Sequence, residues 1–315
     1  MSLNCLSIIR KKHTKHTASV CNGMESIRKK HTTLVCIAAF IIAMPVTWLA
    51  LMPFVRALDG AWADAVRYAA TAAVTLLLMR IIWKRNVFSF KCPNFFRSLF
   101  TFGLVGLIGA AGAFAFGYET VDTVPVAKTV CGVVLMNLAI AVSEEFLFRG
   151  VMLNALLEVY TEKNMYTEKE AHSDKKKIRI NAIYAAVLVS CVIFGLRHLL
   201  NLAAKPNALF MTCAQVVFTF MAGTYLCAVY LRSQNIWVCV LIHILEDLAV
   251  SVWPLFSSAA ASSASADISM PNALGMVAML IPYVVFAWLM LRDKKWQAHF
   301  YDNEKSPMSI ASPSE

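Results

Sequence analysis

Residues 126–148 read VAKTVCGVVLMNLAIAVSEEFLF. The stretch holds 23 residues and is almost wholly apolar, which is the length and composition that an α-helix needs to cross a bilayer. Its last third nevertheless contains two adjacent carboxylates, Glu144 and Glu145. A charged side chain at the bilayer centre costs about 2.5–3.5 kcal/mol on insertion scales. The stretch therefore predicts a membrane-spanning helix whose carboxylates belong to a polar site.

The composition of the whole chain extends this prediction. Hydrophobic residues make up 59% and charged residues 15% of its 315 residues, whereas a soluble domain has about 25% charged residues. We therefore predict an all-α, polytopic membrane helix bundle. The net charge of +10 does not indicate nucleic-acid binding, because the basic residues cluster between the apolar runs, as membrane topology requires. The nine cysteines form no C-x-x-C pair, and we expect no structural disulfide.

Eight stretches are long enough and apolar enough to be transmembrane helices. They are Leu34–Val55, Ala65–Trp83, Leu99–Phe116, Val126–Phe148, Ile180–Leu200, Ala208–Leu231, Ile236–Leu255 and Ala273–Leu291. With the N-terminus in the cytoplasm, this topology places 24 of the 29 Lys and Arg residues on the cytoplasmic side. Such a bias is the positive-inside pattern of membrane proteins. We therefore predict eight spans with both termini in the cytoplasm.

This topology divides the chain into four parts. Residues 1–33 form a basic cytoplasmic arm, which we expect to be disordered, and residues 34–125 contain the first three spans. Residues 126–255 form a core of spans four to seven, which carries the ionisable residues of interest. Residues 256–315 contain a Ser/Ala-rich loop, span eight and a cytoplasmic tail. The short loops and the N-terminal sequence are typical of a protein of the bacterial plasma membrane.

The first ionisable cluster is SEEFLFRG, residues 143–150. Glu145 and Arg149 are four residues apart, so they lie on one face of a helix and can pair. Glu144 points about 100° away from Glu145, and we expect it to lack that cationic partner. A desolvated carboxylate beside another carboxylate is suited to act as a general base near neutral pH. For Glu145 and Arg149, a structural clamp at the helix end is the alternative interpretation.

The other two clusters contain histidines. His198 ends the sequence FGLRH late in the fifth predicted span, where a single histidine is more often a packed core residue than a catalyst. His243 and Asp247, in the sequence HILED, share a helix face in span seven. This pair can bind a metal, or its carboxylate can orient the imidazole. It can also be a buried hydrogen-bonded pair that joins two helices.

Taken together, the three clusters supply the groups that peptide hydrolysis needs. The reaction requires a base for water, a donor for the tetrahedral oxyanion and an acid for the leaving amine. Glu144 and His198 are candidates to deprotonate the water. His243, with or without Asp247, is the candidate that meets the oxyanion. One shared polar site explains the three clusters better than three unrelated structural roles.

The order of these motifs resembles that of a known family. E-E-x-x-x-R at 144–149, F-x-x-x-H at 194–198 and H-x-x-x-N/D at 243–247 follow one another on apolar helices. The pattern resembles the CAAX protease and bacteriocin-processing (CPBP, or Abi) family of intramembrane glutamic endopeptidases, which includes the Ras-converting CAAX endopeptidases. The resemblance covers about residues 126–252.

The resemblance implies four catalytic residues and two supporting ones: Glu144, His198, His243 and Asp247, and Glu145 and Arg149. Glu144 and His198 look like the pair that activates water. Asp247 stands where eukaryotic members usually have Asn, and an Asp side chain donates a hydrogen bond only when it is protonated. Asp247 is therefore also a candidate to orient His243. We expect no cofactor, although two histidines and a glutamate are also a known set of zinc ligands.

The implied function is an intramembrane endopeptidase that acts on a membrane-associated peptide or protein in the lipid bilayer. Its substrate would be a prenylated C-terminal tail in a eukaryote, or a bacteriocin or pheromone peptide in a bacterium. A non-catalytic immunity or scaffold protein that binds a partner at the same polar site is the main alternative. A proton-coupled transporter is less favoured, because the sequence shows no inverted repeat.

Overall fold

The computed structural model describes residues 38, 45–58, 60–82, 94–117, 123–160, 175–204, 206–257 and 269–293. These residues form helices and connecting turns, and no strand occurs among them. The predicted all-α class is therefore confirmed. The basic arm, the first part of the first predicted span apart from residue 38, and most of the Ser/Ala-rich loop lie outside the described residues.

The helices differ in length and type along the chain. In order they are α3 (Thr47–Val55), α4 (Gly60–Ile82), α5 (Phe95–Phe102), α6 (Leu104–Gly117), α7 (Ala127–Glu145), η3 (Phe146–Leu153), α9 (Lys175–Arg197), η4 (His198–Leu200), α10 (Asn201–Ala204), α11 (Leu209–Ser233), α12 (Ile236–Ser251), η5 (Trp253–Phe256), α14 (Met270–Ala278) and α15 (Ile281–Leu291). Of these, η3 is a π-helix, while η4 and η5 are 3₁₀-helices.

Five helical segments in the described part of the chain are long and apolar enough to cross a membrane, and a sixth results if α5 and α6 form one span. The five are Ala127–Tyr160, Asn181–Ala203, Leu209–Ser233, Ile236–Phe256 and Met270–Leu291. They confirm a polytopic membrane bundle and correspond to predicted spans four to eight. The count of eight spans and the cytoplasmic termini stay predictions.

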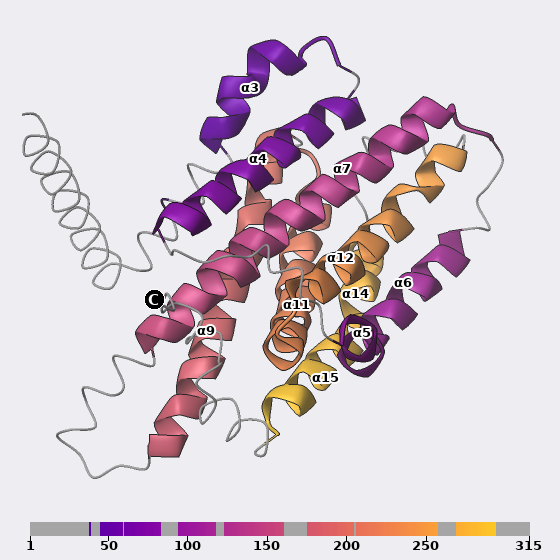
Figure 1. Cartoon of the computed structure of the whole chain (residues 1–315). Helices are drawn as coiled ribbons and strands as arrows, with labels where there is room; N and C mark the ends of the chain where they lie inside the picture. The colour runs from indigo at the N-terminus through magenta and orange to yellow at the C-terminus, as the bar shows by residue number, and fades with distance from the viewer. Residues whose placement is uncertain are drawn as a thin grey trace, which may run out of the picture.

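The helices pack around α7 and α11 (Figure 1). Helix α7 lies between α4 and α12, and α12 also contacts α6. Helix α11 packs against α9, α12, α14 and α15. The middle of α11, residues 225–229, is fully buried for this reason. The apolar core lies where η3, α9, α11, α12 and α15 meet.

The third predicted span, Leu99–Phe116, is not one straight helix in the structure. It is broken between α5 and α6, which meet at a bend of 73°. A side chain at Gly103 has no room there, because a Cβ would lie 2.9 Å from the Ile242 side chain of α12. The Tyr225 hydroxyl compensates the break, since it donates to the Phe102 carbonyl at 2.8 Å and accepts from the Gly106 N–H at 3.1 Å.

The helix that carries the two glutamates is longer than predicted. We expected it to end at Phe148, which placed the pair near its end, but it continues through η3 to Tyr160. Residues 146–157 are all buried by the surrounding helices, and this packing extends the helix beyond the most apolar stretch. Glu144 and Glu145 consequently lie near the middle of a helix of 34 residues.

The side chain of Asn154 supports the π-helical stretch. Its Nδ2 donates to the carbonyls of Arg149 at 2.7 Å and Gly150 at 3.0 Å, and to the Tyr230 hydroxyl of α11 at 2.9 Å. Stretches of π-helix leave the ordinary i to i−4 ladder and are frequent at functional sites. Asn154 thus fixes the turn that contains Arg149 and ties it to α11.

A tight turn sets the register of α12. Gln234 adopts a left-handed conformation, with φ of 54°, and its N–H donates to the Tyr230 carbonyl at the end of α11. Asn235 then caps α12, since its side chain accepts from the Trp237 N–H at 2.9 Å. Because the start of α12 is fixed in this way, the face that carries its histidine is directed toward α7.

Replacing Asn154 with alanine should lower the free energy of unfolding by about 1–3 kcal/mol, because two buried carbonyls lose their donor. The measurement is the melting temperature of the purified protein in detergent micelles. Asn272→Ala is the matched control, since Asn272 is exposed at the start of α14 and its removal should leave the melting temperature nearly unchanged. Equal shifts in the two variants would contradict the proposed role of Asn154.

Candidate active site

Glu145 is wholly buried and holds two partners through one oxygen. Its Oε1 accepts a hydrogen bond from Arg149 Nη1 at 2.9 Å and another from His243 Nδ1 at 2.8 Å. The first contact confirms the pairing predicted from the i, i+4 spacing. Arg149 also donates to the Gly223 carbonyl of α11 and lies over the Phe194 ring of α9. The Glu145 carboxylate and its partners therefore join four helices.

Three carboxylates surround the imidazole of His243. Glu145 binds its Nδ1, whereas Asp247 Oδ2 lies 3.4 Å and Glu144 Oε2 lies 3.9 Å from its Nε2. The orienting role that we considered for Asp247 therefore falls mainly to Glu145, which makes the shorter contact from the neighbouring helix. Asp247 contacts the other ring nitrogen, and its side chain is 31% exposed.

Glu144 is not paired with Arg149, as expected, but it has a different cationic partner. Arg197 Nη1 lies 2.6 Å from Glu144 Oε1, and both side chains are almost fully buried. Arg197 is the last residue of α9, and it also shares a side-chain hydrogen bond with Tyr68 of α4. A second cation is required physically, because burying a charge without a partner is very costly and Arg149 is already committed to Glu145.

His198 follows Arg197 directly and begins the short helix η4. Its Nδ1 lies 3.1 Å from the Phe194 carbonyl oxygen and 3.4 Å from Thr219 Oγ1. A carbonyl oxygen accepts and cannot donate, so Nδ1 carries the proton of the neutral ring. The Nε2 of His198 is then a free acceptor. The side chain is half-buried, which makes it more accessible than Glu144.

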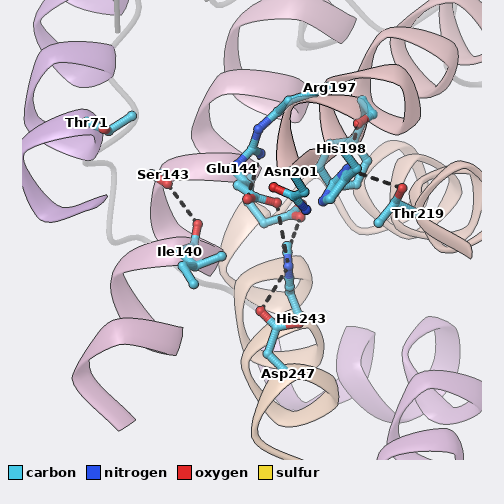
Figure 2. A network of polar contacts seen from close by, with 12 residues as sticks. Thr71, Ile140, Ser143, Glu144, Arg197, His198, Asn201, Thr219, His243 and Asp247 are labelled. Atoms are coloured by element: carbon cyan, nitrogen blue, oxygen red, sulfur yellow. Dashed lines mark hydrogen bonds and ion pairs between the residues drawn. The ribbon is translucent and has the colours of Figure 1, made fainter. Parts of the chain in front are cut away.

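All six site residues predicted from the sequence come together in one region. They are contributed by α7 (Glu144 and Glu145), η3 (Arg149), η4 (His198) and α12 (His243 and Asp247). Figure 2 shows Glu144, His198 and His243 grouped around one region, with Asp247 further along α12. The charges of Glu144, His198 and His243 interact with one another. Three helices distant in sequence therefore build a single polar centre.

Two residues of this centre were missed by sequence reasoning. Arg197 was counted as a cation at the end of a span on the outer side, and Tyr68 carried no motif. A charge balance could have found Arg197, because Glu144, Glu145 and Asp247 together need more than the single cation of Arg149. Tyr68 could not have been found in this way, since its role depends on the packing of α4 against α7.

The zinc alternative finds little support in the arrangement of side chains. Within the described ranges, no group of three or more His, Cys, Asp or Glu side chains is placed to hold a metal ion. Glu144 Oε1 is bound to Arg197, and His243 Nδ1 is bound to Glu145. Metal independence stays a prediction, which can be tested by chelation.

The remaining free atoms define what the centre can do chemically. Glu144 Oε2 and His198 Nε2 are the acceptors that no side chain occupies in the contacts described above. The 3.9 Å between Glu144 Oε2 and His243 Nε2 is longer than a hydrogen bond and suits a bridging water. The bases Glu144 and His198 and the imidazole of His243 therefore lie around a position where water can bind.

Comparison with known proteins gives one match. Residues 126–249 match the family model described as type II CAAX prenyl endopeptidase Rce1-like. Comparisons with curated proteins and with solved structures found no significant match. The matched segment contains all six predicted site residues and Arg197, whereas Tyr68 lies outside it. The resemblance predicted from the three motifs is therefore confirmed.

Replacing Arg149 with methionine should destabilise the protein by about 3–5 kcal/mol, because it leaves the buried Glu145 carboxylate without its cation. Unfolding by denaturing detergent in mixed micelles measures the loss. Arg67→Met is the matched control, since its ion pair with Asp64 is partly exposed and should contribute at most about 1 kcal/mol. If the two variants lost similar stability, the buried Glu145–Arg149 pair would not stabilise the protein more than the partly exposed pair does, and the prediction would fail.

Proposed function

We propose that the chain is an intramembrane endopeptidase, because residues 126–249 match the Rce1-like family model and the described part of the chain contains five helical segments long and apolar enough to cross a membrane. It hydrolyses a peptide bond in a membrane-associated substrate with water that Glu144 and His198 activate. The observation that carries this proposal is the convergence of Glu144, His198 and His243 from three helices around one region.

The first step is the activation of water. A water molecule held between Glu144 Oε2 and His198 Nε2 gives up a proton as its oxygen attacks the scissile carbonyl carbon. Both acceptors are supported by fixed contacts, since Arg197 binds the other oxygen of Glu144 and the Phe194 carbonyl binds Nδ1 of His198. Positioned general bases of this kind contribute about 10²–10⁴-fold to the rate.

The second step places negative charge on the carbonyl oxygen. His243 is the hydrogen-bond donor that stabilises this charge. A neutral His243 that donates Nδ1–H to Glu145 has no proton on Nε2. The imidazolium form has one, and the carboxylates of Glu144, Glu145 and Asp247 balance its charge. We therefore assign the imidazolium form to His243. An ionised Asp247 cannot itself donate to the oxyanion, so its role is to balance the charge of the imidazolium from 3.4 Å away.

The third step breaks the carbon–nitrogen bond. The oxyanion re-forms the carbonyl, the bond electrons move to the leaving nitrogen, and the proton taken from water passes to that nitrogen. His198 is suited to deliver this proton, because the contacts with Phe194 and Thr219 use Nδ1 and leave Nε2 for the reaction, and because its side chain is half-buried. The products are a new carboxyl terminus and a new amine.

The surroundings of His198 favour a substrate that arrives from the membrane. Leu199 and Leu200, the next two residues of η4, are 42% and 56% exposed. Exposed apolar side chains beside the more accessible catalytic group suit a lipidated tail or an apolar peptide. The substrate class is therefore a prenylated C-terminal segment, as the name of the matching family indicates for that family, or a peptide of the pheromone or bacteriocin type.

Glu144→Gln and His198→Ala should each lower kcat/KM by about 10²–10⁴-fold, because each removes a base that acts on water. The assay reconstitutes the protein in liposomes with a labelled library of membrane-anchored peptides, prenylated and unmodified. Glu246→Gln is the matched control: Glu246 is also on α12, but it pairs with the Tyr283 hydroxyl at 2.6 Å and should be dispensable for cleavage. Retained cleavage in both base variants would favour the non-catalytic binding role.

Chelation should leave the activity of the reconstituted protein unchanged, because the proposed steps use side chains alone. The measurement compares cleavage before and after treatment with EDTA and 1,10-phenanthroline, with a zinc-dependent protease as the control in the same buffer. Loss of cleavage that added Zn²⁺ restores would instead assign Glu144, His198 and His243 as metal ligands.

A further inference from the structure

Arg197 is a buried cation that the three proposed steps do not use directly, although it contacts the proposed base. Its Nη1 lies 2.6 Å from Glu144 Oε1, and its side chain is 7% exposed. The second oxygen of Glu144 faces His243 Nε2 at 3.9 Å. Arg197 therefore binds one specific oxygen of the carboxylate and leaves the other one turned toward the reaction.

Tyr68 of α4 also interacts with Arg197. The two side chains share a hydrogen bond, and the charges of Arg197 and Glu144 both act on Tyr68. The Tyr68 ring is in turn packed edge-on against Trp48 of α3, with 5.1 Å between the ring centroids. A continuous series of contacts thus leads from α3 and α4 to the Glu144 carboxylate.

We propose that Arg197 is a positioning residue for the catalytic base, and that Tyr68 fixes the orientation of Arg197. The proposal rests on the proposed function, since it assigns the way in which Glu144 is held for the same reaction. It extends the active site to α4, which lies outside the segment that matches the Rce1-like family.

The chemistry of the guanidinium explains why arginine is needed at this position. Its planar group carries five donors in a rigid fork, so it can bind Glu144 with one N–H and Tyr68 with another. A lysine keeps the charge but donates from a single flexible ammonium. Without Arg197, the Glu144 carboxylate loses its anchor and can rotate, and displacement of a reacting group by about 1 Å can cost 10²-fold in rate.

A direct role for Arg197 in substrate binding predicts a different kinetic result. A residue that grips the substrate equally in the ground and transition states changes KM, whereas a residue that aligns the base changes kcat. The Arg197 side chain is nearly buried and already interacts with Glu144 and Tyr68, which favours the second role. Measuring KM and kcat separately therefore distinguishes a substrate-binding role of Arg197 from a role in positioning the base.

The test measures kcat and KM of Arg197→Ala, Arg197→Lys and Tyr68→Phe in liposomes with a peptide that the parent protein cleaves. Arg197→Ala should lose about 100-fold in kcat with little change in KM, and millimolar guanidinium chloride should restore part of the loss. Arg197→Lys should retain more activity than Arg197→Ala, and Tyr68→Phe should show a smaller loss in kcat. Arg232→Ala is the matched control, because Arg232 is also partly buried and pairs with Asp293 outside the site.

Three results would overturn the inference: parental kcat in Arg197→Ala, a change confined to KM, or a loss that guanidinium does not restore. Glu144→Gln is measured beside these variants, so that failure of the proposed function can be told from failure of the positioning role of Arg197. If Glu144→Gln retains activity, the proposed function itself fails, whatever Arg197 does. If Glu144→Gln is inactive and Arg197→Ala is fully active, the positioning role alone fails.

Discussion

Negative charge inside an apolar helix bundle has to be balanced by buried cations and donors, and this requirement organises the structure around Glu145. One oxygen of that carboxylate binds both Arg149 and His243 at 2.8–2.9 Å, and Arg149 continues to Gly223 and Phe194. Removing one partner of such a buried pair is strongly destabilising. The contacts that hold the helices together are therefore the same contacts that orient the imidazole of His243.

The backbone of the long helix is adapted to this network. The π-helical stretch begins directly after Glu145 and contains Arg149, and the Asn154 side chain satisfies two of its carbonyls. Such stretches cost regular hydrogen bonding and are frequent where a side chain must be directed to a functional position. On the other side of the site, Phe194 contributes both the ring under Arg149 and the carbonyl that binds His198. The FGLRH segment thus supports both halves of the centre.

Most of the bundle and its site followed from local patterns in the sequence. Apolar runs of about 20 residues predicted the spans, and the period of the α-helix predicted the pairing of Glu145 with Arg149. The bend at Gly103 was not predictable, since it depends on the close approach of Ile242 from α12. Nor was the partner of Glu144: the spacing of charges along one helix says nothing about a cation that another helix delivers.

The length of the helix that carries both glutamates has a consequence for how the protein sits in the bilayer. Its 34 residues span about 51 Å at 1.5 Å per residue, whereas the hydrocarbon layer is about 30 Å thick. Even at a tilt of about 40°, the upper end of the range for membrane helices, such a rod exceeds that thickness. Matching the length of this helix to the thickness of the hydrocarbon layer therefore does not fix the depth at which the helix sits in the bilayer. The depth of Glu144 in the bilayer is therefore set by the neighbouring helices that pack against residues 146–157, and it depends more on the packing of the protein than on bilayer thickness.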